Sequence, residues 1–475
     1  MQKKNAYRIE KDIFGAVEIP TDRYWGTQTQ RSLKKFRMGN EKFPESVIAS
    51  FGLQKKCATL ANLSLGLLEK KIAKAIIQTA DEIIKGKFNR DFPLVIWQTG
   101  SGTQTNMNCN EVMANRSNQI LGGDLGARFP VHPNDHVNLC QSSNDTFPTV
   151  MQITLFQQID DVLMPALQYL RTVLLNKAKK WKKVITIGRT HLMDALPIPL
   201  SQEFHVYEQQ ILHNMERIED VKKRLLALPQ GGTAVGTGFN SHPHFAEQFI
   251  RHLRKLSKTP YVSAQIKNEG MASQDVFLEF SGALNVLAAS LVKLCNDIRL
   301  LSSGPRCGIA EYFLPIDGLT SSSMPGKITA TDAEALLQVC YQVMGNHVTV
   351  TLAAAGGNFE LNNFKPVILY NVLHSLTLLA QGMLCLADNC LKKLILNRKK
   401  INQMLTESLS LATALTHHIG YDNTGKIVLQ AMRDGITLKE AALKLKLLSE
   451  EEYKRWVNPA AMIHPRLHKK EKKKK

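Results

Sequence analysis

The segment from Gly318 to Glu334 combines residue types that bind anions. Three consecutive serines, Ser321–Ser323, precede a Met-Pro-Gly-Lys turn that ends at Lys327. Small hydroxyl residues and Gly326 let backbone N–H donors approach a ligand closely, and Lys327 supplies positive charge. Such composition usually means a solvated connection, but this turn directly precedes a strongly predicted helix start. We therefore expect an anion-binding loop here.

Three further segments have the same character. Residues 100–111, 132–145 and 188–194 are rich in Ser, Thr, Asn and His, and we expect each to lead into an apolar helix. Such side chains at a helix N-terminus add to the free backbone N–H groups and to the positive end of the helix dipole. Capping accounts for one such residue per helix, not for runs of six or more. A small carboxylate is the expected ligand.

Several motifs occur together and in a characteristic order. They are Ser101-Gly-Thr103 with Asn106, Ser142-Ser-Asn144, Thr190-His191, Gly231–Gly238, Ser321–Lys327, Gly345–His347, Asn358–Asn362 and Ile419–Asp422. In type and order they resemble the fumarase/aspartase superfamily, and within it the class II (iron-free) fumarate hydratases. The resemblance implies a mainly α fold of three domains, whose long central helical bundle assembles into a tetrameric core. It also implies reversible hydration of fumarate to L-malate by acid/base catalysis, with no cofactor and no metal.

That reaction determines what the site must contain. Its transition state places negative charge on the carboxylate beside the carbon that gains or loses a proton, so preorganised donors must surround this carboxylate. By resemblance, the substrate contacts are Ser101, Gly102, Thr103, Asn106, Ser142, Ser143, Asn144, Thr190, Ser322, Lys327, Ile328 and Thr329. A secondary dicarboxylate-binding segment is implied at His132, Pro133, Asn134 and Asp135, where an Asx-type cap or turn is the structural alternative.

The resemblance assigns catalytic roles to three residues. Ser321 corresponds to the family's loop serine, which takes the carbon-bound proton as an activated alkoxide. His191 corresponds to the histidine that handles the proton of the water, and Glu334 to the glutamate that orients this histidine. A loop serine more often only bonds backbone, and a lone histidine near a helix start is usually structural. The family match favours the catalytic roles.

Glu334 has a second interpretation. Thr331–Glu334 reads Thr-Asp-Ala-Glu, which matches a capping box in which the glutamate folds back onto its own helix start. A carboxylate used in this way cannot also orient His191. We favour the catalytic role.

One departure from the family pattern follows Lys327. Relatives usually have Asn-Pro where this chain has Thr329-Ala330. Loss of a polar contact of this kind costs about 1–3 kcal/mol, so the sequence predicts reduced activity or an altered substrate preference.

Length and composition limit the remaining possibilities. A chain of 475 residues exceeds one ordinary domain. We expect an N-terminal lyase domain over 1–137, a central long-helix bundle over 138–396, a small C-terminal helical domain over 397–465 and a basic disordered tail over 466–475. The eight cysteines form no CxxC pair, and neither HExxH nor a GxGxxG fingerprint occurs. Neither a metal site nor a dinucleotide site is expected.

The net charge of +19 is partly a property of the tail, which contributes +6. The remaining excess would steer a dicarboxylate toward its site. Without aromatic interleaving or a basic recognition motif, no nucleic-acid partner is expected. No apolar signal or membrane-spanning segment is recognised, so we expect a cytoplasmic protein with no membrane partner.

The apolar period is helical almost throughout the chain. The helix expected over Ala272–Ser303 is apolar on two faces, because Ala283, Ala288 and Leu300 flank its main stripe. Such a helix packs against other subunits as well as its own chain. We expect a homotetramer, and in the family three subunits complete each site.

Two alternatives stay open. An aspartate ammonia-lyase would share the fold and the anion loop, but aspartases tend to carry glutamine where His191 stands. A fumarase-like scaffold with reduced or lost activity would fit Thr329 and the basic tail.

Overall fold

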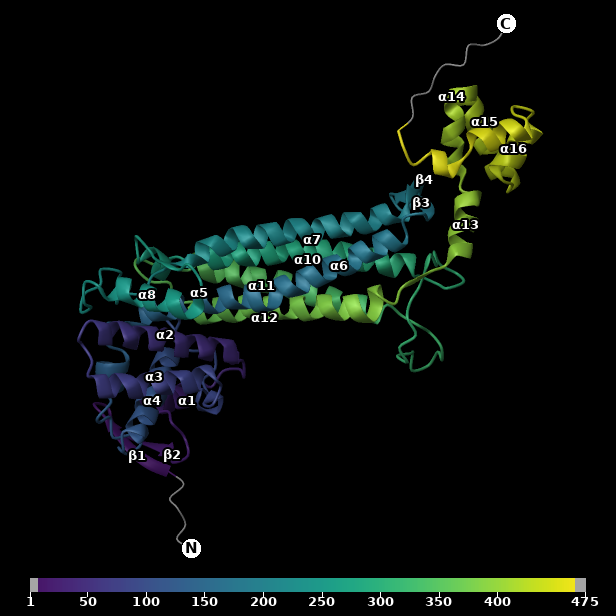
Figure 1. The fold of residues 1–475 in the computed structure, drawn as a ribbon. Coiled ribbons are helices and arrows are strands. Elements are labelled where there is room, and N and C mark those ends of the chain that lie inside the picture. Colours follow the sequence, from purple (N-terminus) through teal and green to yellow (C-terminus); the bar gives the residue numbers. More distant parts are fainter. Residues whose placement is uncertain (1–6, 466–475) are drawn as a thin grey trace. The chain divides into compact units, whose positions relative to one another are not determined.

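The computed structural model describes residues 7–465, and it is mainly helical (Figure 1). Its chain divides into two compact units. The first takes in residues up to Ala166 together with Asn214–Ala289 and Gln338–Gln381, and the second takes in Leu167–His213, Ser290–Leu337 and the chain from Gly382 on. The tail predicted over 466–475 lies outside the described residues.

The first unit begins with an antiparallel hairpin and then becomes helical. Its elements are β1 (Tyr7–Asp12), β2 (Gly15–Pro20), α1 (Thr27–Lys35), α2 (Glu45–Ser64), α3 (Lys70–Ile84), α4 (Thr103–Ile120), α5 (Ser143–Gln158), β5 (Ala227–Leu228), α8 (Phe245–Ser257), β6 (Val262–Ser263) and α9 (Glu269–Ala272). Strands β5 and β6 form a short parallel pair. Apolar side chains such as Phe51, Ile76 and Phe147 are fully buried between these helices.

Five long helices run side by side (Figure 1). They are α6 (Met164–Lys180), α7 (Leu200–Lys222), α10 (Asp275–Leu301), α11 (Thr331–Ala355) and α12 (Lys365–Cys385). Hydrogen bonds join successive pairs: Arg171 to Glu208, Tyr207 to Asp297, Ser281 to His347, and Asn346 to Ser375. The long-helix bundle expected from the apolar period is therefore present.

Helix α10 differs in its bounds from the sequence expectation. Its main stripe is buried at Phe280, Leu284, Leu287 and Leu291, but the chain breaks after α9 and restarts at Asp275. By length and composition alone, Asp275–Leu301 and Lys365–Leu391 are apolar enough to cross a membrane, with mean hydropathy of 1.5 and 1.4. The core helices of a bundle satisfy the same criterion, so length and composition alone do not indicate that these helices cross a membrane.

The second unit contains short strands and the C-terminal helices. These are β3 (Ile185–Thr190), β4 (Met193–Pro199), β7 (Tyr312–Phe313), β8 (Ile395–Leu396), α13 (Arg398–Glu407), α14 (Thr416–Ile419), α15 (Tyr421–Asp434), α16 (Leu438–Lys444) and α17 (Glu450–Trp456). A separate small apolar cluster forms around Leu415, Ile427 and Ala441.

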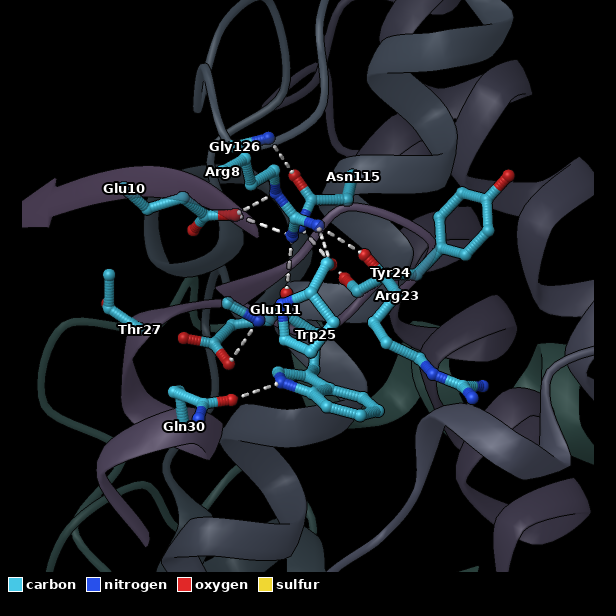
Figure 2. A network of polar contacts seen from close by, with 12 residues as sticks. Arg8, Glu10, Arg23, Tyr24, Trp25, Thr27, Gln30, Glu111, Asn115 and Gly126 are labelled. Carbon is cyan, nitrogen blue, oxygen red and sulfur yellow. Dashed lines mark hydrogen bonds and ion pairs between the residues drawn. The ribbon is translucent and has the colours of Figure 1, made fainter. Parts of the chain in front are cut away.

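Arg8 joins the N-terminal hairpin to the segment that leads into α1 (Figure 2). Its guanidinium group donates to Glu10 Oε1 at 2.7 Å and to the backbone oxygens of Pro20, Arg23 and Trp25 at 2.8, 2.6 and 2.7 Å. Hydrogen bonds to a charged group are stronger than neutral ones. The segment that enters α1 is therefore held at several points.

Glu111, from the polar segment 100–111, ends up as a structural residue. Its buried carboxylate accepts the backbone N–H groups of Gly26, Gln28 and Thr29 at 2.9, 2.7 and 3.1 Å, and so caps the N-terminus of α1 (Figure 2). Asn115, one turn later, donates to the Tyr24 carbonyl at 2.8 Å. Together they fix α4, whose first turn carries the predicted substrate contacts.

Candidate active site

The N-terminus of α4 is shaped by glycine. Gly102 adopts φ +76°, and a Cβ atom there would lie 2.2 Å from the Phe147 ring. A side chain is therefore excluded both by conformation and by space. Ser101 and Thr103 share a hydrogen bond of 2.7 Å between their hydroxyls. The Ser-Gly-Thr motif thus forms the helix start that the sequence predicted.

The N-terminus of α5 carries a capping box. The Ser142 hydroxyl accepts the N–H of Asn144 at 3.2 Å, and Asp145 Oδ1 accepts the N–H of Ser142 at 2.9 Å. Asn144 donates to the Ala234 carbonyl at 2.9 Å. Segment 132–145 therefore leads into a helix start, as predicted.

The two helix starts are joined to each other. Asn106, fully buried in the first turn of α4, donates from Nδ2 to Ser143 Oγ at 3.1 Å. Among the described residues no partner is found for its buried Oδ1. Four predicted contacts, Thr103, Asn106, Ser142 and Ser143, thus lie at two adjoining helix N-termini, where backbone N–H groups and the helix dipoles favour an anion.

The glycine-rich motif supports α5. Asp145 Oδ2 accepts the N–H groups of Gly231 and Thr233, both at 2.9 Å. Burial raises the pKa of Asp145 to about 6, although these N–H donors oppose the shift. The motif that resembled the family therefore has a structural role, because it holds the first turn of α5.

The predicted secondary segment forms a π-helical turn, Pro133–Val137. His132 caps it, because its Nδ1 accepts the N–H groups of Asn134 and Asp135, both at 3.2 Å. Burial lowers the pKa of His132. Pro133 is buried, whereas Asn134 and Asp135 are exposed. The capping alternative is thus present, and the dicarboxylate role stays a prediction.

The expectation that segment 188–194 leads directly into a helix was wrong. Thr190 ends β3 and Met193 begins β4, so His191 and Leu192 form a two-residue hairpin turn. Their φ angles are +57° and +63°, the left-handed pair that such turns require. His191 is exposed at the tip of this hairpin, not at a helix start.

The hairpin is anchored by a buried carboxylate. Glu311 is fully buried, its carboxylate accepts the Thr186 hydroxyl at 2.9 Å, and it pairs with Arg189 Nη1 at 2.6 Å. Nearby, burial raises the pKa of Glu203 to about 7, and the charge of Glu311 adds to the effect. These contacts fix the strand that ends at Thr190.

The serine loop has no regular structure, and Ser321 is its most protected serine. Ser321 Oγ accepts the N–H groups of Ser323 and Met324 at 3.4 and 3.2 Å. The φ of Gly326 is +81°, a conformation that favours glycine. Ser322 and Lys327 are exposed.

A cavity of about 400 Å³ lies behind the loop in the second unit. Predicted residues that line it are Lys327, Ile328, Thr329 and Glu334, and Asn296 and Arg299 of α10 line it as well. Glu334 Oε1 lies 3.5 Å from Arg299 Nη2. Helix α11 begins at Thr331 itself, with the Glu334 N–H donating to the Ala330 carbonyl at 3.0 Å. The carboxylate of Glu334 therefore has an ionic partner, Arg299, that the sequence did not indicate.

The structure thus gathers the predicted contacts into separate groups. Ser101–Asn106 and Ser142–Asn144 meet in the first unit. The second unit holds Thr190 and His191 on the hairpin, Ser321 and Ser322 in the serine loop, and Lys327–Thr329 with Glu334 at the cavity. Within residues 7–465, no group of three or more His, Cys, Asp or Glu side chains is arranged to hold a metal ion. Sequence reasoning missed Arg299, Glu311 and the buried Lys55, which carry no local motif.

A long helical bundle, two adjoining helix N-termini rich in Ser, Thr and Asn, and a serine loop are the arrangement of a lyase of the fumarase/aspartase type. Comparison with known proteins agrees: a family model described as Lyase matches residues 15–345 and one described as Fumarase C C-terminus matches residues 411–464. The chain belongs to the class II fumarate hydratases, and its reaction is the hydration of fumarate.

Individual relatives support this assignment over nearly the whole chain. A class II fumarate hydratase of Rickettsia felis is 52% identical, covering 96% of this chain and 99% of its own length. A mitochondrial fumarate hydratase of Danio rerio is 49% identical, covering 98% and 92%. The crystal structure of a class II fumarase from Schistosoma mansoni has a TM-score of 0.93 and 40% identity, covering 96% and 99%. These names favour a hydratase over an ammonia-lyase.

Proposed function

We propose that fumarate binds with one carboxylate at the joined N-termini of α4 and α5, that His191 and Ser321 move the protons, and that Glu334 orients His191. The observation that carries this proposal is the hydrogen bond between Asn106 and Ser143, because it aligns two helix starts on one point. Preorganised donors of this kind are the largest single source of transition-state stabilisation in many enzymes.

Ser321 is the proposed base in the direction of malate dehydration. Its Oγ accepts two backbone N–H groups, and these same donors stabilise an alkoxide at that atom. The alkoxide takes the proton from the carbon beside a carboxylate, and the hydroxyl group leaves the neighbouring carbon. In hydration the proton returns from Ser321 to that carbon.

His191 is the proposed partner on the other side of the substrate. It takes a proton from water as the C–O bond forms, and returns it to the leaving hydroxyl in the reverse direction. The left-handed turn carries its ring at the exposed hairpin tip. Glu334 is proposed to orient this ring, and its pair with Arg299 holds the carboxylate at the cavity wall.

We further propose that the active protein is a homotetramer with composite sites. The serine loop precedes α11, a helix of 25 residues and therefore about 38 Å long, and the other polar segments sit on different elements. Large apolar residues are exposed on the same bundle: Val286 by 41%, Val348 by 59% and Leu352 by 71%. Burial against other subunits would remove this surface from water.

The remaining assignments are proposals as well. We propose the cytoplasm as the compartment, and we note that some relatives are named as mitochondrial. We also propose the division into three domains and a basic tail that the sequence analysis gives. The role of 132–135 as a second dicarboxylate site also stays proposed.

Purified protein offered fumarate, L-malate and L-aspartate in parallel tests the function. Turnover of the first two without release of ammonia from aspartate is the expected result. Release of ammonia from aspartate would support the ammonia-lyase alternative, and no turnover of any of the three compounds would support the inactive scaffold.

A further inference from the structure

Lys55 is an unusual residue of the first unit. It lies in the middle of α2 with no exposed surface, although its neighbour Lys56 is accessible and pairs with Asp81 at 2.6 Å. Taking an ammonium group out of water costs several kcal/mol unless its charge is compensated. The partners of Lys55 therefore indicate what the residue does.

Those partners are neutral. Lys55 Nζ donates to Asn138 Oδ1 at 3.1 Å and to Gln141 Oε1 at 3.0 Å. The ion pairs found among residues 7–465 do not include this lysine. The carboxylate whose charge acts on Lys55 is that of Asp145, and the oxygens of this carboxylate already accept backbone N–H groups. The positive charge is thus only partly compensated within the chain.

The neutral partners lead directly to the proposed substrate site. Asn138 Oδ1 also accepts from Asn106 Nδ2 at 3.1 Å and from Asn110 Nδ2 at 3.0 Å. Asn106 in turn donates to Ser143 Oγ at 3.1 Å. A continuous chain of hydrogen bonds therefore connects the ammonium group of Lys55 to the first turns of both α4 and α5.

We propose that Lys55 is a positioning residue of the fumarate site, which orients Asn138, Asn106 and Ser143 and supplies the buried positive charge that a substrate carboxylate completes. The two helix N-termini are themselves positive, so Lys55 adds charge of the same sign in a water-poor region. That arrangement is unfavourable in the empty protein and becomes favourable when a dianion binds. The inference rests on the proposed placement of the substrate carboxylate at these helix starts.

A buried lysine elsewhere in the chain shows what a structural role looks like. Lys177 Nζ donates to the backbone oxygens of Lys392 and Leu394 at 3.0 and 2.9 Å, where chain carbonyls at a helix end supply negative potential. Both lysines thus donate to neutral oxygens, but the partners of Lys177 are backbone carbonyls with no link to the predicted substrate contacts, whereas the partner Asn138 of Lys55 is bonded to Asn106.

The test compares Lys55→Met with Lys56→Met and Lys177→Met. We expect KM for fumarate to rise about tenfold or more in Lys55→Met with kcat changed less than threefold, because a unit charge near an anion is worth at least this factor. KM should stay within twofold of wild type in Lys56→Met and in Lys177→Met, whatever happens to their thermal stability. In Lys55→Arg, which keeps the positive charge, KM for fumarate should lie closer to the wild-type value than in Lys55→Met.

Asn138→Asp provides a second route if Lys55→Met does not fold. It keeps the lysine and the size of its partner but places a carboxylate 3.1 Å from Nζ, so it should neutralise the charge and raise KM by a similar factor. Folded Lys55→Met or Asn138→Asp protein with KM within twofold of wild type would overturn the inference.

Calorimetric titration with succinate separates this inference from the function itself. Succinate carries the same two carboxylates but cannot react. Weaker binding by Lys55→Met or Asn138→Asp supports the role of Lys55 even if the wild type turns over no fumarate, in which case only the function fails. Equal binding by wild type and variants, or a wild type that binds neither succinate nor fumarate, contradicts the role of Lys55.

Discussion

Replacement of His191 by asparagine isolates the imidazole from the turn that carries it. His191 and Leu192 occupy left-handed conformations with φ +57° and +63°, and asparagine is among the residues that tolerate this conformation best. The backbone should therefore keep its hairpin. Because the side chain is exposed, the free energy of unfolding should change by no more than about 0.5 kcal/mol.

The loss of activity should be much larger. A positioned acid or base contributes about 10²- to 10⁴-fold, so kcat should fall by roughly 100-fold or more, which corresponds to about 2.7 kcal/mol or more of transition-state stabilisation. Hydration of fumarate followed by its ultraviolet absorbance measures the rate, and thermal unfolding measures the stability.

Leu192→Asn is the matched control. It introduces the same side chain at the next turn position, where leucine is 79% exposed, and leaves the imidazole in place. Its kcat should remain within about threefold of wild type. A folded His191→Asn protein that keeps more than about a tenth of the wild-type kcat would refute the role assigned to His191.

Three further outcomes are expected. Thr329→Asn should raise kcat/KM by roughly tenfold, since restoring a polar contact is worth about 1–3 kcal/mol; an unchanged or lower value would show that the cavity residues already compensate. The Glu203→Gln variant should become more stable relative to wild type as pH rises from 5 to 8. Burial raises the pKa of Glu203 to about 7, so the folded wild type binds this proton more tightly than the unfolded chain does. The wild type therefore loses stability as this proton leaves, and the variant does not. A pH-independent difference in Tm would contradict that sign. Incubation with a chelator should leave fumarate hydration intact, and a loss of activity that iron restores would overturn the iron-free assignment.

The helical starts were predictable because their signals are local. Ser142 and Asp145 form a capping box within four residues, and Gly102 is followed by Thr103 at the start of α4. The long bundle helices were predictable for the same reason, since their apolar period is continuous. Helix α10 ends at Leu301, close to the end that we expected at Ser303.

The hairpin at His191 was not predictable from local signals. Turns of this type usually contain Asn-Gly or a similar pair, whereas this turn contains His191 and Leu192. Its conformation is maintained by the pairing of β3 with β4 and by the contacts of Glu311 with Thr186 and Arg189. Sequence reasoning instead treated residues 188–194 as a polar segment that leads into a helix.

Lys55 was missed because its environment is tertiary. In the sequence it stands beside Lys56 and reads as part of a solvated helix face. Its burial follows from Asn138 and Gln141, more than eighty residues away in the chain. The ion pair between Glu334 and Arg299 is likewise formed between different helices.

Subunit complementation tests the central claim most directly, that residues of different subunits complete each site. Ser321→Ala and His191→Asn proteins, each nearly inactive, would be dissociated, mixed and reassembled, with mixing of subunits verified by a mass tag. Partial recovery of fumarate hydration is predicted, because some composite sites then contain both intact residues. A fully active wild-type monomer by light scattering, or no recovery despite verified mixing, would contradict composite sites.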